Sequence, residues 1–331
     1  MKYQSAKLRK RSQLPVNRNN PDRWKADIAR SVDFFNRWFV AFAPKAFRET
    51  RIETTRQVEA ALRWTENLTK ITPDVLRDHP DVLQMLRMAT CPPIARDRLI
   101  GLSGVWKTLV GYMEHKDALP PRMSSRTFEQ EARKIIVIIK QLVDPDIFTW
   151  LNRKEQPETS EIHRAATIVA DRLCGAVADP IVRNAQEARQ LSVISKWLKR
   201  RGYALVAKGV KFDAMEPGTY GFRLNVPVRM DNVERPVNIP IDVLVMPKRG
   251  KKGQFPLLIE AKSAGDFTNV NKRRKEEAAK MAQLRKNYGK QVRFILFLCG
   301  YFDTGYLGYE AAEGIDWVWE HRIDDLEEFG V

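Results

Sequence analysis

Hydrophobic and polar positions follow two different patterns along this chain, and the change falls near residue 200. Residues 23–150 repeat apolar side chains at helical spacing, and the stretches 161–177 and 180–201 continue that pattern up to Gly202. Beyond this glycine, short apolar runs separated by Gly- and Pro-containing segments predict β-strands. The pattern therefore predicts a helical N-terminal part followed by a part that mixes strands with helices.

Prolines mark the expected ends of helices in the N-terminal part. Pro44 is expected to stop a first helix over residues 27–42, and Pro180 is expected to open the last one. The apolar run 135–139 lies between helical flanks, which favours a buried helix over a buried strand. The polar segment 152–163 predicts a domain boundary. Further helices are expected at 51–68, 73–88, 94–113 and 125–143.

Two apolar runs, 241–246 and 255–262, predict a β-hairpin because a short polar connector with two glycines separates them. The run 292–300 is almost continuously apolar, as is typical of a central strand in a mixed sheet. Further strands are expected at 203–206, 222–228 and 316–319, with helices at 276–288 and 324–329. The expected fold class is α/β (α+β), with a central mixed β-sheet flanked by helices and preceded by an all-α N-terminal domain.

This pattern divides the chain into three parts. Residues 1–22 are polar and basic and predict a flexible arm, which could follow a DNA backbone or have no specific role. Residues 23–158 form the predicted helical domain, and residues 159–331 form the predicted sheet domain.

The composition of the chain indicates what kind of partner it binds. The chain has 331 residues with 44% hydrophobic content, which is enough for a globular core. Lys and Arg number 57 against 41 Asp and Glu, giving a net charge of +16, so nucleic acid is the first partner to consider, although some basic proteins bind none. Three separated cysteines exclude a disulfide framework and a thiolate zinc site, and four scattered histidines disfavour a His-rich metal site or a His-based nuclease centre. No apolar run reaches the length of a membrane span, so a cytoplasmic location is expected.

Charged residues interrupt the predicted hairpin at three positions: Asp242, Glu260 and Lys262. An unpaired buried charge is costly, so carboxylates on such strands indicate a site. Glu260 and Lys262 are two residues apart and project from one face of a strand, which Asp242 can reach from the neighbouring strand. Two carboxylates beside an ammonium suit a divalent cation, and phosphodiester hydrolysis requires such a cation to activate water. These residues predict a magnesium-dependent nuclease.

A basic segment follows the hairpin directly. Eight Lys and Arg residues lie between Lys272 and Lys290, on a segment with helical character. Such a run is usually a solvated face, but its position after the carboxylates favours contact with DNA phosphates. The expected DNA-binding residues are Asn269, Asn271, Lys272, Arg273, Arg274 and Lys275.

The spacing of these residues resembles that of a known superfamily. Asp242 followed by Glu260-Ala261-Lys262 resembles the PD-(D/E)XK nuclease pattern, although Pro240-Ile241-Asp242 departs from a literal Pro-Asp pair. The longer stretches 87–101, 183–190 and 260–278 resemble type II restriction endonucleases of the XamI-like family. The resemblance covers most of the chain from about residue 30.

The resemblance implies a restriction-endonuclease-like core and magnesium-dependent, site-specific cleavage of double-stranded DNA that leaves 5′-phosphates. Asp242 and Glu260 would ligate Mg²⁺, with the Ala261 carbonyl as a further ligand. Lys262 would position the attacking water or help to deprotonate it. Glu187 would be an additional acidic residue of the active site. A homodimer and a cognate DNA methyltransferase are the implied partners.

Two alternatives remain open from the sequence. One is a PD-(D/E)XK nuclease with another purpose, such as repair, junction resolution or defence encoded by a mobile element. The other is a non-catalytic DNA-binding protein on the same fold, which the intact set of Asp242, Glu260 and Lys262 disfavours.

Overall fold

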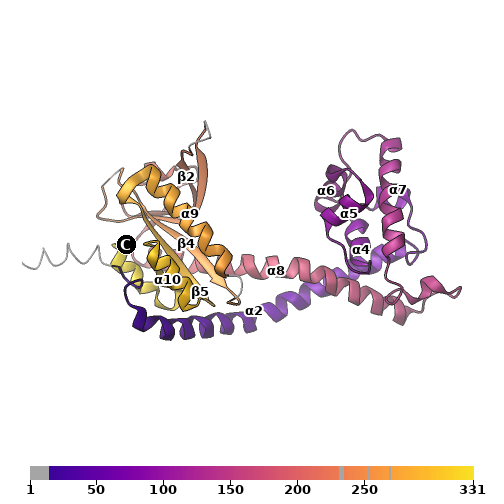
Figure 1. The fold of residues 1–331 in the computed structure, drawn as a ribbon, viewed down its shortest axis with the longest axis horizontal. Coiled ribbons are helices and arrows are strands. Elements are labelled where there is room, and N and C mark those ends of the chain that lie inside the picture. Colours follow the sequence, from indigo (N-terminus) through magenta and orange to yellow (C-terminus); the bar gives the residue numbers. More distant parts are fainter. Residues whose placement is uncertain (1–14, 231–234, 252, 268–269) are drawn as a thin grey trace, which may run out of the picture. The chain divides into compact units, whose positions relative to one another are not determined.

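The computed structural model describes residues 15–230, 235–251, 253–267 and 270–331 (Figure 1). The side chains of 176–179 and 270–274 are not described. The chain forms two compact units. The first, here the sheet unit, consists of Met1–Ala41 and Arg183–Val331, and the second, here the helical unit, consists of Phe42–Val182. Each unit is described by itself below.

The sheet unit is built on a six-stranded mixed sheet in the order β1-β2-β3-β4-β5-β6. Strands β2, β3 and β4 are antiparallel to one another, whereas β1 is parallel to β2 and strands β4, β5 and β6 are parallel. The predicted hairpin and the predicted central strand are therefore confirmed as β3–β4 and β5. The strands are β1 (Ala204–Leu205), β2 (Thr219–Val228), β3 (Val237–Met246), β4 (Leu257–Ala264), β5 (Arg293–Gly300) and β6 (Asp316–Trp319).

Helices cover both faces of this sheet, which confirms the expected fold class. On one face, α9 (Val270–Tyr288) and α10 (Thr304–Ala312) share a core with Leu244 and Met246 of β3. On the other face, Val243 and Val245 join the core formed with the end of α8 (Thr159–Arg200) and the 3-10 helix η4 (Glu320–Phe329). Successive side chains of β3 thus enter opposite cores, as strand geometry requires.

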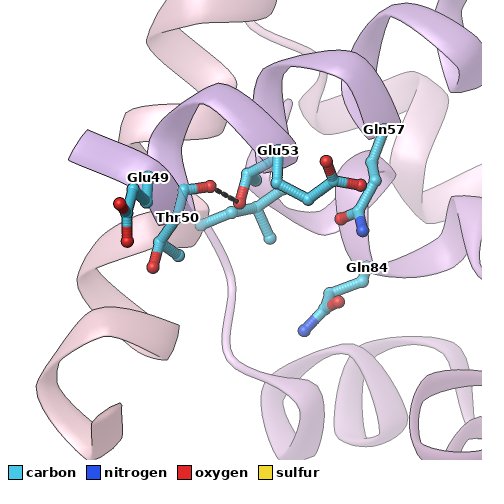
Figure 2. Close-up of a pocket in the computed structure, with 7 residues that line it drawn as sticks. Glu49, Thr50, Glu53, Gln57 and Gln84 are labelled. Carbon is cyan, nitrogen blue, oxygen red and sulfur yellow. Dashed lines mark hydrogen bonds between the residues drawn. The ribbon is translucent and has the colours of Figure 1, made fainter. Parts of the chain in front are cut away.

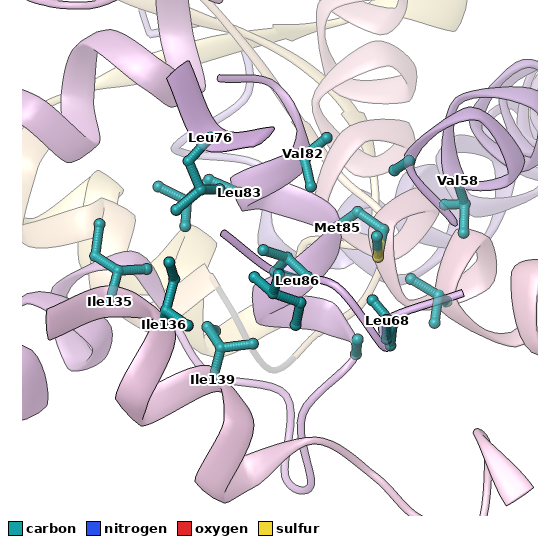
Figure 3. Packing of buried hydrophobic residues seen from close by; sticks show 14 of the residues in the cluster. Val58, Leu68, Leu76, Val82, Leu83, Met85, Leu86, Ile135, Ile136 and Ile139 are labelled. Carbon is teal, nitrogen blue, oxygen red and sulfur yellow. The ribbon is translucent and has the colours of Figure 1, made fainter. Parts of the chain in front are cut away.

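The helical unit has a separate apolar core (Figure 3). The predicted buried helix at 135–139 is confirmed within α7 (Ser125–Leu142), whose Ile135 and Ile139 are fully buried together with Leu83 and Leu86 of α4 (Val82–Met88). The remaining helices are α3 (Pro73–Asp78), α5 (Arg96–Ser103), α6 (Lys107–Lys116) and the short 3-10 helices η1 (Thr149–Asn152), η2 (Phe212–Ala214) and η3 (Gly289–Gln291), of which η2 and η3 belong to the sheet unit.

Two prolines lie inside helices although Pro44 was expected to end a helix and Pro180 to begin one. Pro44 is within α2 (Pro21–Trp64), and Pro180 is within α8. A proline inside a helix costs about 3 kcal/mol, mainly through a lost hydrogen bond and a steric clash. Both helices pack apolar residues on either side of the proline, so tertiary burial outweighs the local preference. The expected helix ends at these positions were wrong.

The compact units do not follow the predicted boundaries at 22/23 and 158/159. The first turns of α2 belong to the sheet unit because they pack against it. The Gly300 amide at the end of β5 donates to Ser31 Oγ at 2.8 Å. Arg322 donates to Asp27 at 2.7 Å, and Phe35 packs edge-on against Tyr301. Both boundaries of the compact units thus lie C-terminal to the predicted ones, at 41/42 and 182/183, within the two long helices.

Part of the predicted basic arm is anchored to the sheet. Residues 1–14 lie outside the described part of the chain. The amides of Val16, Asn17 and Arg18 donate to the carboxylate of Asp316, at 2.6, 3.0 and 3.0 Å. Three amides on one carboxylate form strong charge-assisted hydrogen bonds. Residues 16–18 are therefore anchored to β6, and α2 already begins at Pro21 within the predicted arm.

Replacing Asp316 with alanine is expected to release this segment and to lower the free energy of unfolding by about 2–3 kcal/mol, because three amides lose a charged acceptor. Urea titration measures the effect, with the exposed Glu328→Ala as a matched control. Unchanged stability in Asp316→Ala would show that the carboxylate does not hold the N-terminal segment.

No helix in the described ranges is long and apolar enough to cross a membrane.

Candidate active site

The hairpin brings Asp242, Glu260 and Lys262 together. Val243 pairs with Ile259 in the antiparallel ladder of β3 and β4, so the next facing positions are Asp242 and Glu260. The Ala261 amide donates to Asp242 Oδ2 at 2.8 Å, and Lys262 Nζ donates to Glu260 Oε1 at 3.2 Å. Lys262 thus contacts Glu260 directly, and the charges of Glu260 and Lys262 both act on Asp242.

The backbone is distorted beside Asp242. The ladder between β2 and β3 is regular on both sides of this position, but the pair formed by Arg223 and Asp242 is missing from it. Arg223 has a φ of 51°, in the left-handed region that non-glycine residues rarely adopt. Non-glycine residues held in such sparsely populated backbone regions cluster at active sites.

Charge and burial change the acidity of Asp242. Burial raises the pKa of Asp242 to about 6, and the negative charge of Glu260 adds to this, whereas the hydrogen bond from Ala261 and the charge of Lys262 oppose it. Burial and the neighbouring carboxylate both disfavour the ionised form of Asp242. A cation bound beside Asp242 would favour that ionised form.

Lys262 is held as an ammonium ion. Burial lowers the pKa of Lys262, but the charges of Glu260 and Glu277 and the hydrogen bonds to them outweigh this, so the net pKa is raised. A lysine whose pKa is raised keeps its proton at neutral pH. The observed arrangement thus favours the positioning role expected for Lys262 over its role in deprotonating water.

Helix α9 contributes two residues that the sequence reasoning missed. Lys262 Nζ lies 2.9 Å from Glu277 Oε1, and Lys280 Nζ donates to Glu260 Oε1 at 2.5 Å. Glu277 and Lys280 are three residues apart, so they lie on one face of the helix. That spacing was visible in the sequence, but the surrounding basic residues led to the interpretation of the whole segment as a DNA-facing surface.

Glu187 is near the carboxylates but is bound elsewhere. It lies on α8, and its Oε1 accepts a hydrogen bond from Arg223 Nη2 at 2.5 Å. Its charge contributes to raising the pKa of Asp242, as the smallest of the identified causes. Within the described ranges, no three His, Cys, Asp or Glu side chains gather closely enough to hold a metal ion, so Glu187 does not form a ligand cluster with Asp242 and Glu260.

The residues at the hairpin nevertheless fit a magnesium ion. Mg²⁺ is usually held by one or two carboxylates, with water and substrate phosphate completing its six ligands. Glu260 Oε2 is buried and has no hydrogen-bond partner among the described residues, which leaves an oxygen available for a cation. Asp242, Glu260 and the backbone carbonyl of Ala261 form the candidate set.

Gln190 supports this part of the sheet from behind. It lies on α8 with 1% of its surface exposed. Its Nε2 donates to the carbonyls of Lys262 and Phe297, both at 3.3 Å, and so ties β4 to β5. Gln190 was also absent from the sequence-based prediction, because a single glutamine on a helix carries no recognisable signal.

Most of the predicted DNA-binding residues cannot be placed. Asn269 lies outside the described residues, and so do the side chains of Asn271, Lys272, Arg273 and Arg274, whose backbone forms the start of α9. Lys275 is exposed on the same helix. Their contact with DNA stays a prediction.

A pocket of about 320 Å³ lies elsewhere, in the helical unit (Figure 2). Its polar lining carries acidic side chains and amides but no basic side chain, so it does not suit a phosphate backbone. The lining residues are Glu49, Thr50, Glu53, Thr54, Gln57, Gln84 and Leu173. The charged residues of the hairpin are therefore a better guide to the active site than this pocket.

Comparison with known proteins assigns the chain to a family. The profile of the XamI restriction endonuclease family matches residues 66–319, which is more than half of the chain. The chain belongs to the XamI restriction endonuclease family. As a member of that family, the protein is a site-specific endodeoxyribonuclease. The type II restriction enzyme SalI of Streptomyces albus G is 53% identical over 317 residues, covering 95% of this chain and 99% of its own length.

One solved structure is also similar, though weakly. The crystal structure of protein VC1899 from Vibrio cholerae aligns with a TM-score of 0.28 and 13% identity. The alignment covers 86% of this chain, which spans 55% of that structure. This likeness is too low to inform the fold.

Proposed function

We propose that this restriction endonuclease uses Mg²⁺ to cut both strands of DNA at a short specific sequence and leaves 5′-phosphates. The observation that carries the proposal is the convergence of Asp242, Glu260 and Lys262 on the edge between β3 and β4, where Glu260 keeps a buried oxygen without a hydrogen-bond partner in the described structure. Family membership favours a restriction enzyme over a repair nuclease or a non-catalytic binder.

The residues of the chain have distinct parts in this reaction. Asp242, Glu260 and the Ala261 carbonyl hold the cation, which when bound activates water and neutralises charge on the phosphate. The Lys262 ammonium orients the attacking water and stabilises negative charge that develops on the phosphate oxygens. Water attacks the phosphorus and the bond to the 3′-oxygen breaks, so one fragment ends in a 3′-hydroxyl and the other keeps the phosphate on its 5′ end.

The partners follow from the same proposal. Cutting both strands of a symmetric site requires two active sites, which a homodimer with two-fold symmetry supplies. A host that contains such an enzyme must protect its own sites, so a cognate DNA methyltransferase belongs to the same system. The cytoplasmic location also stays a prediction.

Removing the metal is expected to abolish cutting. Purified protein incubated with phage DNA and Mg²⁺ should give discrete bands, whereas the same mixture with EDTA should leave the DNA intact, because the carboxylates alone cannot activate water. Ligating the fragments without kinase treatment tests for 5′-phosphates. A smear with Mg²⁺ would indicate non-specific cleavage, and cutting in EDTA would contradict the proposed cofactor.

A further inference from the structure

Glu277 is a fully buried carboxylate with one ion-pair partner among the described residues. It lies on α9 with 0% of its surface exposed. Its Oε1 is 2.9 Å from Lys262 Nζ in that ion pair, and neither of its oxygens has a hydrogen-bond partner of regular geometry among the described residues. Burying a carboxylate costs several kcal/mol unless it is well paired. The position therefore requires a reason beyond local packing.

Stability does not supply that reason. Buried ion pairs can often be replaced by neutral groups of similar shape with no loss of stability. The neighbouring Glu276 is exposed on the same helix, so the chain keeps one of two adjacent glutamates in water and buries the other against Lys262.

Two carboxylates from different elements hold the Lys262 ammonium. Glu260 lies at 3.2 Å on the same strand, and Glu277 lies at 2.9 Å on the helix that covers it. A lysine side chain has a flexible stem of four carbons, so fixing its charged end requires contacts from more than one direction. The pair therefore restricts where the ammonium can lie.

The two carboxylates are not equivalent. Glu260 also accepts a hydrogen bond from Lys280, and under the proposed function it binds the cation as well. Glu277 has Lys262 as its only ion-pair partner in the described part of the chain. Because Glu260 is shared among Lys262, Lys280 and the proposed cation, Glu277 is the acceptor that serves the Lys262 ammonium alone.

We propose that Glu277 is a positioning residue that holds the Lys262 ammonium beside the scissile phosphate. This inference rests on the proposed function, because it assigns Glu277 a role through Lys262. Glu277 itself touches neither substrate nor the candidate cation ligands Asp242 and Ala261 in the contacts described.

The test compares Glu277→Gln, which keeps the shape and removes the charge, with Glu276→Gln as a matched control. Single-turnover cleavage with Mg²⁺ measures the chemical step, DNA affinity in EDTA measures binding, and thermal melting measures the fold. We expect Glu277→Gln to cut roughly 10–100-fold more slowly, as is typical when a supporting residue of a metal site is changed. DNA affinity and melting temperature should match those of the wild type, and Glu276→Gln should be normal throughout.

Glu277→Asp adds a second measurement. It retains the carboxylate on a shorter stem, so it is expected to cut faster than Glu277→Gln. Wild-type rates in Glu277→Gln would overturn the inference, and so would a fall in melting temperature that accompanies the loss of rate, since that would assign Glu277 to stability. If the wild type itself fails to cut with Mg²⁺, the proposed function fails; if the wild type cuts and Glu277→Gln cuts equally well, only the inference fails.

Discussion

Replacing Asp242, Glu260 or Lys262 with alanine is expected to remove double-strand cleavage while DNA binding persists. Each side chain acts on charge that develops at the phosphate, and deleting one such group typically costs about 10²–10³-fold in rate. Losing a candidate metal ligand also weakens cation binding, so the effect of Asp242→Ala and Glu260→Ala should reach at least that size. Single-turnover cleavage measures the rate, and a gel shift in EDTA measures binding.

The exposed Lys251 in the connector of the same hairpin provides a control for removing a lysine. Lys251→Ala should cut at the wild-type rate, because its side chain lies away from the carboxylates on a solvated turn. Full activity in any of the three alanine variants would refute the role assigned to that residue. Loss of DNA binding together with cleavage would instead indicate a damaged fold.

Cleavage is expected to fall as the pH drops through about 6, because the raised pKa of Asp242 lets a proton compete with the cation there. Below that pH, the ionised fraction of one carboxyl falls about tenfold for each pH unit. Single-turnover rates measured from about pH 5 to about pH 8 at several Mg²⁺ concentrations test this. Higher Mg²⁺ should shift the midpoint of the pH profile to lower pH. A midpoint that does not change with Mg²⁺ concentration would exclude competition between the proton and the cation for Asp242.

The Asp242 carboxyl affects folding stability in the opposite direction, because low pH favours the folded state although it slows cleavage. Its folded pKa of about 6 is above the ordinary value of 3.8, so the folded state binds the proton more tightly than the unfolded chain. Its contribution stabilises the protein at low pH and is lost as the pH rises from about 4 to about 6. Asp242→Asn should therefore be more stable at neutral pH without metal, by on the order of 1–2 kcal/mol, although it cannot cut.

Urea titrations of both proteins at about pH 7 and about pH 4 check this, because the difference should shrink at the lower pH. An Asp242→Asn variant that is less stable at neutral pH would show that the carboxylate is well accommodated without a cation.

Local pattern was sufficient for the strands and for the proposed catalytic triplet. The runs at 241–246 and 255–262 are largely apolar and are separated by a glycine-containing connector, and these signals depend only on near neighbours. Once the hairpin forms, the positions of Asp242, Glu260 and Lys262 on one face follow from strand geometry. Local pattern predicted helix boundaries at Pro44 and Pro180, and both predictions were wrong. The packing of long helices on distant elements outweighs the cost of a proline inside them.

The sequence by itself determined a mixed sheet flanked by helices and the three charged residues of the candidate active site. Only the tertiary structure decided where the compact units divide and that Asp316 anchors the N-terminal segment. It alone showed Glu277 and Lys280 turning back from α9 onto β4. The physical reason is that periodicity reports which face a residue occupies, whereas the partner of a buried charge depends on elements far away in the chain.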